Sequence, residues 1–378
     1  MIIVQQPAID QYAKEARLSA KIDYGSESCQ LVYSVPIEYG HWFTTDRCDG
    51  FVVGLLLQAM ERHEDMIVEG PLSSRLFHSL QGFFIPMMAQ AFPNLHPIKI
   101  IPSSLTDAPS GGNGVATGFS GGIDSFATVV QHWAREESPS HKVSHFLFHN
   151  AGSHSTGDPE AARRLFHQRY ATLKPFAQEA EIPFVPVDSN VSEIFPIDFI
   201  RMHPTLNASI PLVLQNQFHR YFYASTYKYA DCGVNKTDDI ARFDPMAFHL
   251  LSTEGLDCVS TGCQMSRVEK TRLVASYEAS RRHLNVCVDP AFEGRNCSVC
   301  FKCARTLLTL ELLGCADAYQ DVFDLNKFRQ IRMKYLLKCL RYKPGSFEAE
   351  IAELIRQKGR EPLAMAFKLR HLWDRLTW

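Results

Sequence analysis

The chain has 378 residues, a length that fits two or three domains, and 46% of the residues are hydrophobic, as in ordinary globular enzymes. This composition excludes a collagen-like fibre and an intrinsically disordered chain, and the net charge of -2 favours no class of partner. The N-terminus lacks the basic start and apolar core of a signal peptide, and no run reaches the roughly 18 apolar residues of a membrane span. We therefore expect a cytoplasmic protein without membrane contact, whose 11 cysteines are thiols or ligands and not disulfides.

Residues 1–110 are predicted to form an N-terminal α/β domain, whose role the sequence does not indicate. Strand-like and helix-like stretches alternate in it, and Pro71 suits the first turn of its last helix. The stretch 106–114 is polar and rich in helix and strand breakers, which predicts a domain boundary. The expected strands are 28–40, 65–70 and 96–103, and the expected helices are 50–63 and 71–92.

From Val115 onward, apolar strands and amphipathic helices alternate regularly, up to about residue 315. This pattern predicts an α/β fold in which a Rossmann-like parallel sheet is covered by helices on both faces. Ligands of such sheets bind beyond the carboxyl ends of the strands. The expected strands are 115–119, 142–149 and 182–189, the expected helices are 124–136 and 158–180, and 207–227 is expected to run from helix into strand.

The C-terminal region, 316–378, is predicted to be helical, with helices over 323–342, 347–359 and 362–378. It is also basic, with 13 Lys or Arg against 5 Asp or Glu between Leu325 and Trp378. Because the basic residues alternate with apolar ones, we interpret them as solvated faces of helices that pack on the sheet. A nucleic-acid or partner surface is the alternative, which we do not favour.

The stretch Ser120–Ser125, Ser-Gly-Gly-Ile-Asp-Ser, connects the first strand of the parallel unit to its helix. Successive glycines let backbone N–H groups approach an anion, and the two serine hydroxyls add further donors. Asp124 would repel a polyphosphate unless a cation such as Mg²⁺ bridged them. The alternative is a plain strand-to-helix turn with a capping residue, but the full string in this setting favours a phosphate site.

This string resembles the SGGxDS signature of the PP-loop ATP pyrophosphatases. The resemblance implies a Rossmann-like sheet of the HUP type from residue 115 to 315, which binds ATP and Mg²⁺. It also implies that the loop binds the β,γ-pyrophosphate of ATP, that Asp124 binds magnesium, and that Asp124 takes part in catalysis. The residues that would form this site are Ser120, Gly121, Gly122, Ile123, Asp124 and Ser125.

Four cysteines fall close together in the segment 287–303, with a spacing of Cys-x9-Cys-x2-Cys-x2-Cys. Overlapping Cys-x2-Cys pairs are typical of tetrahedral Zn²⁺ sites, and four thiolates leave no open position, so we predict structural zinc. An iron–sulfur cluster and unliganded core thiols are the alternatives. The cluster also resembles the zinc motif of 7-cyano-7-deazaguanine synthases, although those begin almost at the loop and this chain does not. The predicted ligands are Cys287, Cys297, Cys300 and Cys303.

Arg267 and Lys270 are candidates for the positive charge that the loop lacks. They are three residues apart, so on one helix they share a face and could neutralise the departing pyrophosphate. Lys270 resembles in position the late lysine of PP-loop enzymes. The alternative is an exposed helix held by a Glu269–Arg272 pair. Weaker candidates are His149, Asn150 and His154, which follow the second strand, and Glu254, as a general base or an amine-orienting group.

The resemblance implies a ligase that activates a carbonyl or carboxylate oxygen as its AMP adduct, releases pyrophosphate, and lets ammonia or an amine displace AMP. Its partners would be a small-molecule, protein or peptide substrate and an amine donor, and a homodimer is compatible with the sequence. One alternative is an ATP-dependent sulfur transferase that uses Cys258 or Cys263. Another is a nucleotide-binding partner protein without turnover.

Overall fold

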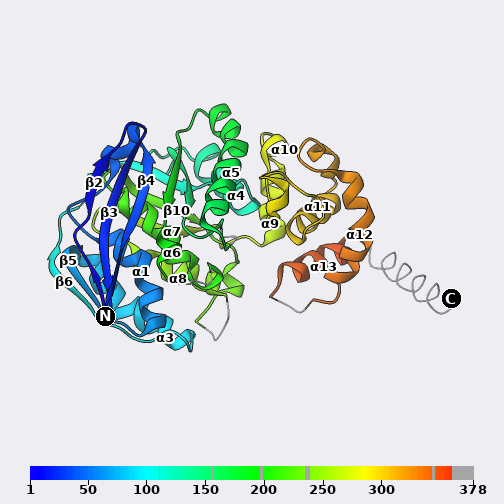
Figure 1. Ribbon diagram of the computed structural model, residues 1–378. Coiled ribbons are helices and arrows are strands. Elements are labelled where there is room, and N and C mark those ends of the chain that lie inside the picture. Colours follow the sequence, from blue (N-terminus) through cyan, green and yellow to red (C-terminus); the bar gives the residue numbers. More distant parts are fainter. Residues whose placement is uncertain (110, 155–156, 196–198, 235–238, 343–344, 360–378) are drawn as a thin grey trace.

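The protein is an α/β fold built on one large open sheet (Figure 1). The structure is a computed structural model, and within the residues that it describes eleven strands join this sheet, most of them parallel to a neighbour. This agrees with the predicted Rossmann-like class. The described residues are 1–109, 111–154, 157–195, 199–234, 239–342 and 345–359.

The parallel unit lies at one end of the sheet, and its spatial order is β9-β8-β7-β10-β11. Every neighbouring pair in this order is parallel. The chain therefore adds strands on one side of β7 and then on the other, which creates a switch point between β7 and β10 where doubly wound sheets bind ligands. The strands are β7 (Gly114–Gly118), β8 (His145–Asn150), β9 (Phe184–Ser189), β10 (Phe218–Ala224) and β11 (Asp257–Thr261).

The N-terminal strands continue the same sheet past β9. Strand β4 pairs antiparallel with β9, where Tyr33 lies opposite Ser189 and Ser34 opposite Asp188. The division at residue 110 stays a prediction, but one sheet spans both sides of it. The N-terminal strands are β1 (Ile2–Val4), β2 (Ala8–Gln11), β3 (Glu15–Tyr24), β4 (Glu27–Pro36), β5 (Met66–Ser73) and β6 (Ile100–Thr106).

Helices cover both faces of the sheet. Successive strand residues point to opposite faces, so neighbouring residues of β7 pack in different cores. Val115 packs in one apolar core with α4 (Ile123–Val129), which runs on as a π-helical turn (Val130–Ala134), and α5 (Pro159–Glu179). Ala116 packs in a second core with α1 (Asp49–Arg62) and α7 (Phe199–Val213). Shorter helices are α2 (Ser74–Ser79), α3 (Ile85–Ala91), α6 (Val191–Ile194) and α8 (Asp244–Ala247).

The later helices gather beside the parallel unit, and we refer to residues 267–357 as the helical module (Figure 1). Helices α12 and α13 pack on α11, and α13 also on α9, so the expectation that they lie on the sheet is wrong for them. The predicted helix 362–378 lies outside the described residues. The helices of the module are α9 (Arg267–Ala275), α10 (Ser280–His283), α11 (Phe301–Leu313), α12 (Leu325–Cys339) and α13 (Phe347–Gln357).

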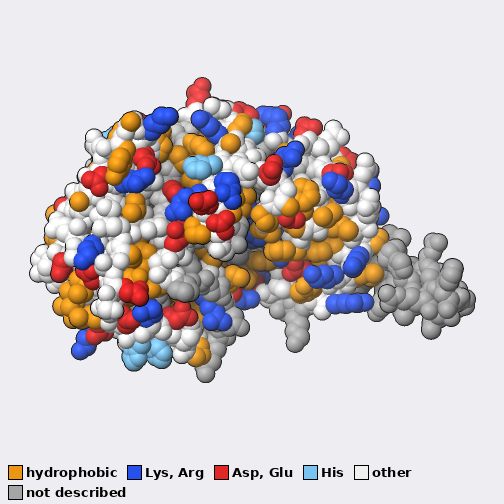
Figure 2. Space-filling model, in the orientation of Figure 1, with side chains coloured by type: hydrophobic (Ala, Val, Ile, Leu, Met, Phe, Trp, Pro, Cys, Tyr) orange, Lys and Arg blue, Asp and Glu red, His pale blue; other side chains and the backbone are white. Residues whose placement is uncertain are grey.

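Charges of both signs are mixed over the face of the sheet region seen in Figure 2, whereas apolar side chains gather over the helical module. The mixture fits the small net charge of the chain. Within the described residues, no helix has the length and apolar character needed to cross a membrane.

The N-terminal region differs from the sequence prediction at Pro71 and in its first three strands, β1 to β3, which were not among those expected. Pro71 does not begin a helix: it lies in β5, at an irregularity in the pairing with β6, where a missing N–H is tolerated. Helix α2 begins later, at Ser74. Strand β3 was not expected, although the buried residues Ala16, Leu18, Ala20 and Ile22 alternate as a strand requires.

A glycine substitution tests whether the N-terminal region and the parallel unit share one core. Helices α1 and α7 pack closely at Gly50, where an added Cβ would lie 2.9 Å from the Ser209 carbonyl oxygen and would also overlap Val213. We expect Gly50→Ala to lower the free energy of unfolding by about 2 kcal/mol, because the backbones cannot separate without losing packing. The matched control is Gly82→Ala, since nothing lies within 4 Å of an added Cβ there. Equal stability of both variants in urea unfolding would contradict a shared core.

Candidate functional site

The loop Ser120–Ser125 lies at the carboxyl end of β7, at the switch point of the parallel unit. Gly121 has a φ of +72°, a left-handed conformation that side chains disfavour. A Cβ at Gly121 would also overlap Leu173 of α5. Glycine is therefore needed at this position for both its conformation and its lack of a side chain.

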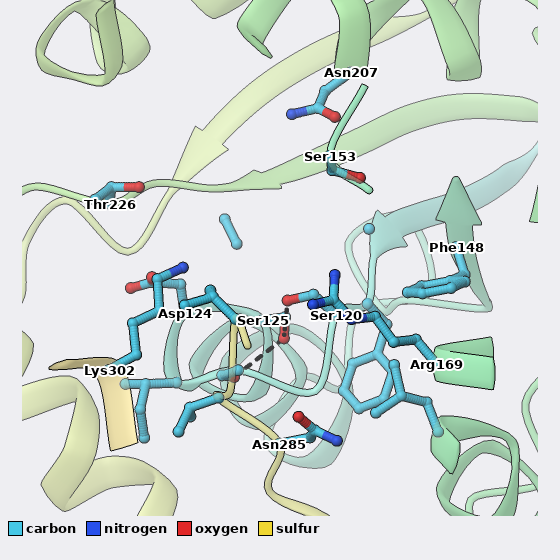
Figure 3. A pocket seen from close by; sticks show the side chains of 18 of the residues that line it. Ser120, Asp124, Ser125, Phe148, Ser153, Arg169, Asn207, Thr226, Asn285 and Lys302 are labelled. Atoms are coloured by element: carbon cyan, nitrogen blue, oxygen red, sulfur yellow. Dashed lines mark hydrogen bonds between the residues drawn. The ribbon is translucent and has the colours of Figure 1, made fainter. Parts of the chain in front are cut away.

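The two loop serines face each other at the start of α4 (Figure 3). The Ser120 hydroxyl donates to Ser125 Oγ at 3.3 Å, and the Ser125 hydroxyl donates to the Gly122 carbonyl at 3.1 Å. Both bonds are long for hydroxyl donors, so an anion in the cavity offers these hydroxyls a better acceptor.

Asp124 lies between two cations from α9. One carboxylate oxygen lies 2.8 Å from the Arg267 guanidinium, and the other lies 3.1 Å from Lys270 Nζ. Burial raises the pKa of Asp124, but the charges of Arg267 and Lys270 outweigh it and hold that pKa below its usual value. Asp124 is therefore a carboxylate at neutral pH, which magnesium binding requires.

Lys270 is fully buried, with 1% of its side chain exposed, and its ammonium also donates to the Ser225 carbonyl at 2.5 Å. It lies one turn into α9, which begins after a capping box of Ser266 and Glu269. Glu269 therefore caps α9. The alternative of an exposed helix held by a Glu269–Arg272 pair is not what the structure shows, because α9 faces the loop. The structure places both Arg267 and Lys270 beside Asp124.

A cavity of about 420 Å³ opens over the loop. It is bounded by the ends of β7, β8 and β10, by α5 and by the helical module. All the predicted loop residues line it except Gly121, which forms the turn beneath, and Arg267 lines it whereas Lys270 lies behind. Lining side chains that the sequence did not single out include Arg169, Asn207, Thr226, Lys302, Arg305 and Phe347.

Arg169 and Lys302 are the positive groups of the cavity that lack a carboxylate partner among the described residues. Their side chains extend toward the loop from opposite sides in Figure 3. Lys302 is exposed to the cavity, yet the protein atoms on its other sides and the nearby Arg267 lower its pKa. Burial likewise lowers the pKa of Arg169. A bound anion would stabilise the charged forms of both groups.

Arg305 is the third unpredicted cation, and it is already paired. Its guanidinium lies 2.8 Å from Glu348, which also accepts from the Tyr335 hydroxyl at 3.0 Å. The ring of Phe347 lies between Arg305 and Arg267, 4.6 and 4.8 Å from their guanidinium carbons. Helix α13, from the basic C-terminal region, thereby positions two cations of the cavity.

Two histidines that line the cavity are uncharged. Burial lowers the pKa of His149 to about 4 and that of His154 to about 3, so both line the cavity as neutral rings. Asn150 is not among the lining residues and donates to Asp188 at 2.7 Å. Glu254 is not among them either, since it accepts from the Arg75 amide at the start of α2. Of these four candidates, the structure thus places His149 and His154 in the lining of the cavity and Asn150 and Glu254 outside it.

The four predicted cysteine ligands come together in the helical module. Their sulfur atoms all lie within 4.8 Å of one another, and the pairs Cys287–Cys300 and Cys297–Cys303 are each 3.9 Å apart. Zn–S bonds of about 2.3 Å in a tetrahedron place the sulfurs about 3.8 Å apart, so the arrangement fits one metal ion. No other group of metal-binding side chains as compact occurs among the described residues.

Backbone amides point at the sulfurs of the cluster. Cys297 Sγ accepts from the amides of Val299 at 3.4 Å and Cys300 at 3.1 Å, and Cys287 Sγ accepts from the amide of Cys297 at 3.4 Å. Such donors stabilise thiolates and orient them toward a metal. Ser298, with a φ of +68°, forms the tight turn that makes this possible. The donor set favours Zn²⁺, and the metal's identity stays a prediction.

The cysteines considered for sulfur transfer lie elsewhere. Cys258 and Cys263 are buried, and neither lines the cavity. Burial raises the pKa of Cys258 far above its usual value, which removes the thiolate that a nucleophile needs.

Comparisons of the chain with protein-family models, curated proteins and solved structures gave no match.

Replacing Asp124 by asparagine tests its role as partner of two cations. We expect Asp124→Asn to lower the free energy of unfolding by about 3 kcal/mol at pH 7, because Lys270 remains buried without its carboxylate. Since the pKa of Asp124 is lowered on folding, its contribution is full above about pH 5 and declines as the pH falls through the lowered value. Urea unfolding of both proteins between pH 3 and 8 measures the difference. A difference that grows toward low pH would contradict the ion pairs.

The cysteine cluster predicts one zinc ion per chain. We expect Cys300→Ser to lose the metal and to unfold at a lower temperature, because removing one of four thiolates weakens a structural site. Cys315→Ser is the matched control, since Cys315 is also half-buried but bonds only to the Leu310 carbonyl. Metal analysis of the purified proteins measures the outcome. Equal metal content in the two variants would contradict the assignment.

Proposed function

We propose that the protein is an ATP-dependent adenylating enzyme of the C–N ligase type, which releases pyrophosphate and AMP. A carbonyl or carboxylate oxygen of the substrate attacks the α-phosphorus, the bond from the α-phosphorus to the bridging oxygen breaks, and pyrophosphate leaves with both electrons. Ammonia or an amine then displaces AMP. The observation that carries the proposal is the loop Ser120–Ser125 at the switch point, faced by Arg169 and Lys302, which have no carboxylate partner among the described residues.

The position of the loop supports a nucleotide rather than an arbitrary anion. The loop combines hydroxyls, the small residue Gly122 and the start of a helix at the end of β7, which suits closely approaching phosphate oxygens. Phe148, His149 and Tyr223 also line the cavity and offer flat, uncharged surfaces for an adenine ring. Arg267 and Lys302 line the cavity from the helical module and Arg169 lines it from α5, so the cations flank the loop from two sides.

The charges around Asp124 support pyrophosphate as the leaving group. The loop brings no lysine of its own, yet Arg267 and Lys270 lie within 3.1 Å of Asp124. Magnesium would be held by Asp124 and would screen the β- and γ-phosphates from its carboxylate. Arg267 and Lys302 can then stabilise the negative charge that develops as pyrophosphate departs. Catalysis in this scheme is positioning and electrostatic stabilisation.

The bond that is broken in ATP tests this function. Incubation with ATP, Mg²⁺, ammonium and candidate acids is expected to yield AMP and pyrophosphate, because the loop is proposed to hold the β- and γ-phosphates together. Separation of the nucleotide products by chromatography measures it. ADP and phosphate as products would contradict the proposal, and so would the absence of ATP binding in calorimetry.

Removing the unpaired cations tests which residues support the leaving group. We expect Lys302→Met and Arg169→Met each to lower kcat/KM for pyrophosphate release by about 100-fold, the typical loss when a charge that stabilises a transition state is removed. Lys334→Met and Arg164→Met are matched controls, because both residues are exposed and neither lines the cavity. Equal losses in the controls would show that general charge and not this cavity is responsible.

A further inference from the structure

The four-cysteine cluster borders the cavity. Cys287 lines the cavity, together with Val286 and Val288 on either side of it. Lys302 lines it from the first turn of α11, between Cys300 and Cys303. The segment that carries the sulfurs is therefore also a wall of the anion site.

Asn285 connects this wall to the loop. Its main-chain N–H donates to the Gly121 carbonyl at 2.8 Å, and a Cβ on Gly121 would lie 3.3 Å from Asn285 Cβ. Its side-chain amide donates to the Gly294 carbonyl, in the turn that precedes Cys297. Asn285 stands two residues before Cys287, so the Cα atoms of the two residues are at most about 7 Å apart.

The position of Lys302 also depends on the cluster. Cys300 is the N-cap of α11 and Cys303 lies in its first turn, so a metal bound to both sulfurs sets where this helix begins. Among the described residues no carboxylate lies within ion-pair distance of Lys302. The placement of that turn therefore sets where its side chain starts.

The segment that carries the four cysteines is also held by hydrogen bonds that do not involve sulfur. The Asn296 side chain donates to the carbonyls of Leu284 at 2.8 Å and Val322 at 3.0 Å, and it accepts from the Val286 amide at 2.9 Å. These bonds tie the segment to the module whether or not a metal is bound. Loss of the metal should thus loosen the cavity wall locally before the module unfolds.

We propose that a metal bound by the four cysteines positions the anion site, with Asn285 as the positioning residue for the loop and Lys302 as the cation whose place the metal sets. The metal site is thereby a structural requirement of anion binding as well as of stability. This inference rests on the proposed function only in taking pyrophosphate as the anion.

Hydrogen exchange of the full-length chain tests the coupling without a ligand. We expect removal of the metal by a chelator to speed amide exchange about fivefold or more in the peptide covering 284–287, since the bond from the Asn285 amide to Gly121 opens more often. Exchange in the loop peptide covering 119–126 should rise as well, since the loop loses this contact with the wall. The affinity for pyrophosphate with Mg²⁺, measured by calorimetry, should fall about tenfold or more. Circular dichroism checks that the chain remains folded.

Asn285→Ala supplies a second measurement that keeps all four thiols. Alanine keeps the main-chain N–H that bonds to Gly121 and removes only the side-chain bond to Gly294. We expect the variant to retain the metal, to speed exchange in the same two peptides because residue 285 is no longer held at Gly294, and to weaken pyrophosphate binding. Asn326→Ala is the matched control, because Asn326 lies in the same module and, among the described residues, its side chain accepts a hydrogen bond from Arg329 alone. If the metal-free chain unfolds, Asn285→Ala still tests whether Asn285 positions the loop.

The outcomes separate the two proposals. Unchanged loop exchange in Asn285→Ala, or in a folded metal-free chain, overturns the positioning role. Faster loop exchange in a chain whose metal-loaded form binds no pyrophosphate supports the positioning role and contradicts the proposed function instead. Faster exchange with weakened pyrophosphate binding supports both.

Discussion

The arrangement of the site depends on one buried ion pair, between Lys270 and Asp124. Lys270 is enclosed by protein, and a charged amine in that position is tolerated only with a carboxylate and further acceptors at hand. Asp124 supplies the carboxylate from α4, and Ser225 supplies a carbonyl from the end of β10. A single side chain of α9 therefore joins the loop, the sheet and the helical module, and the cavity lies where the three meet.

The charge distribution of the cavity follows from this junction. Among the described residues that line the cavity, Asp124 is the one acidic group, and two cations already neutralise it. Arg169 and Lys302 have no carboxylate partner among the described residues, whereas the lining histidines are buried and neutral. A site that combines surplus positive charge around the loop with uncharged rings is suited to a ligand with a polyanionic end and a flat apolar end.

The helical module completes this site from outside the sheet. Helix α13 holds Arg267 and Arg305 against Phe347, and the segment from Asn285 to Lys302 forms the remaining wall. The cysteine cluster lies within that wall, so bound metal and bound anion would act on the same few residues. Coupling of this kind needs no long pathway, because one hydrogen bond, from Asn285 to Gly121, connects them.

Local patterns in the sequence determined the alternation of strands and helices after residue 115, the glycine-rich loop and the spacing of the four cysteines. Each of these depends on residues a few positions apart, and the structure shows the strands, the loop at the end of β7 and the sulfurs within reach of one ion. The strand β3 could have been found in the same way, from its alternating buried residues. Only the tertiary structure decided that β4 continues the sheet from β9, and that Arg169 and Lys302 converge on the loop while Asn150 and Glu254 do not. These side chains come from elements far apart in the chain, and which of them meet is set by packing across the sheet, a long-range constraint that leaves no periodic mark on the sequence.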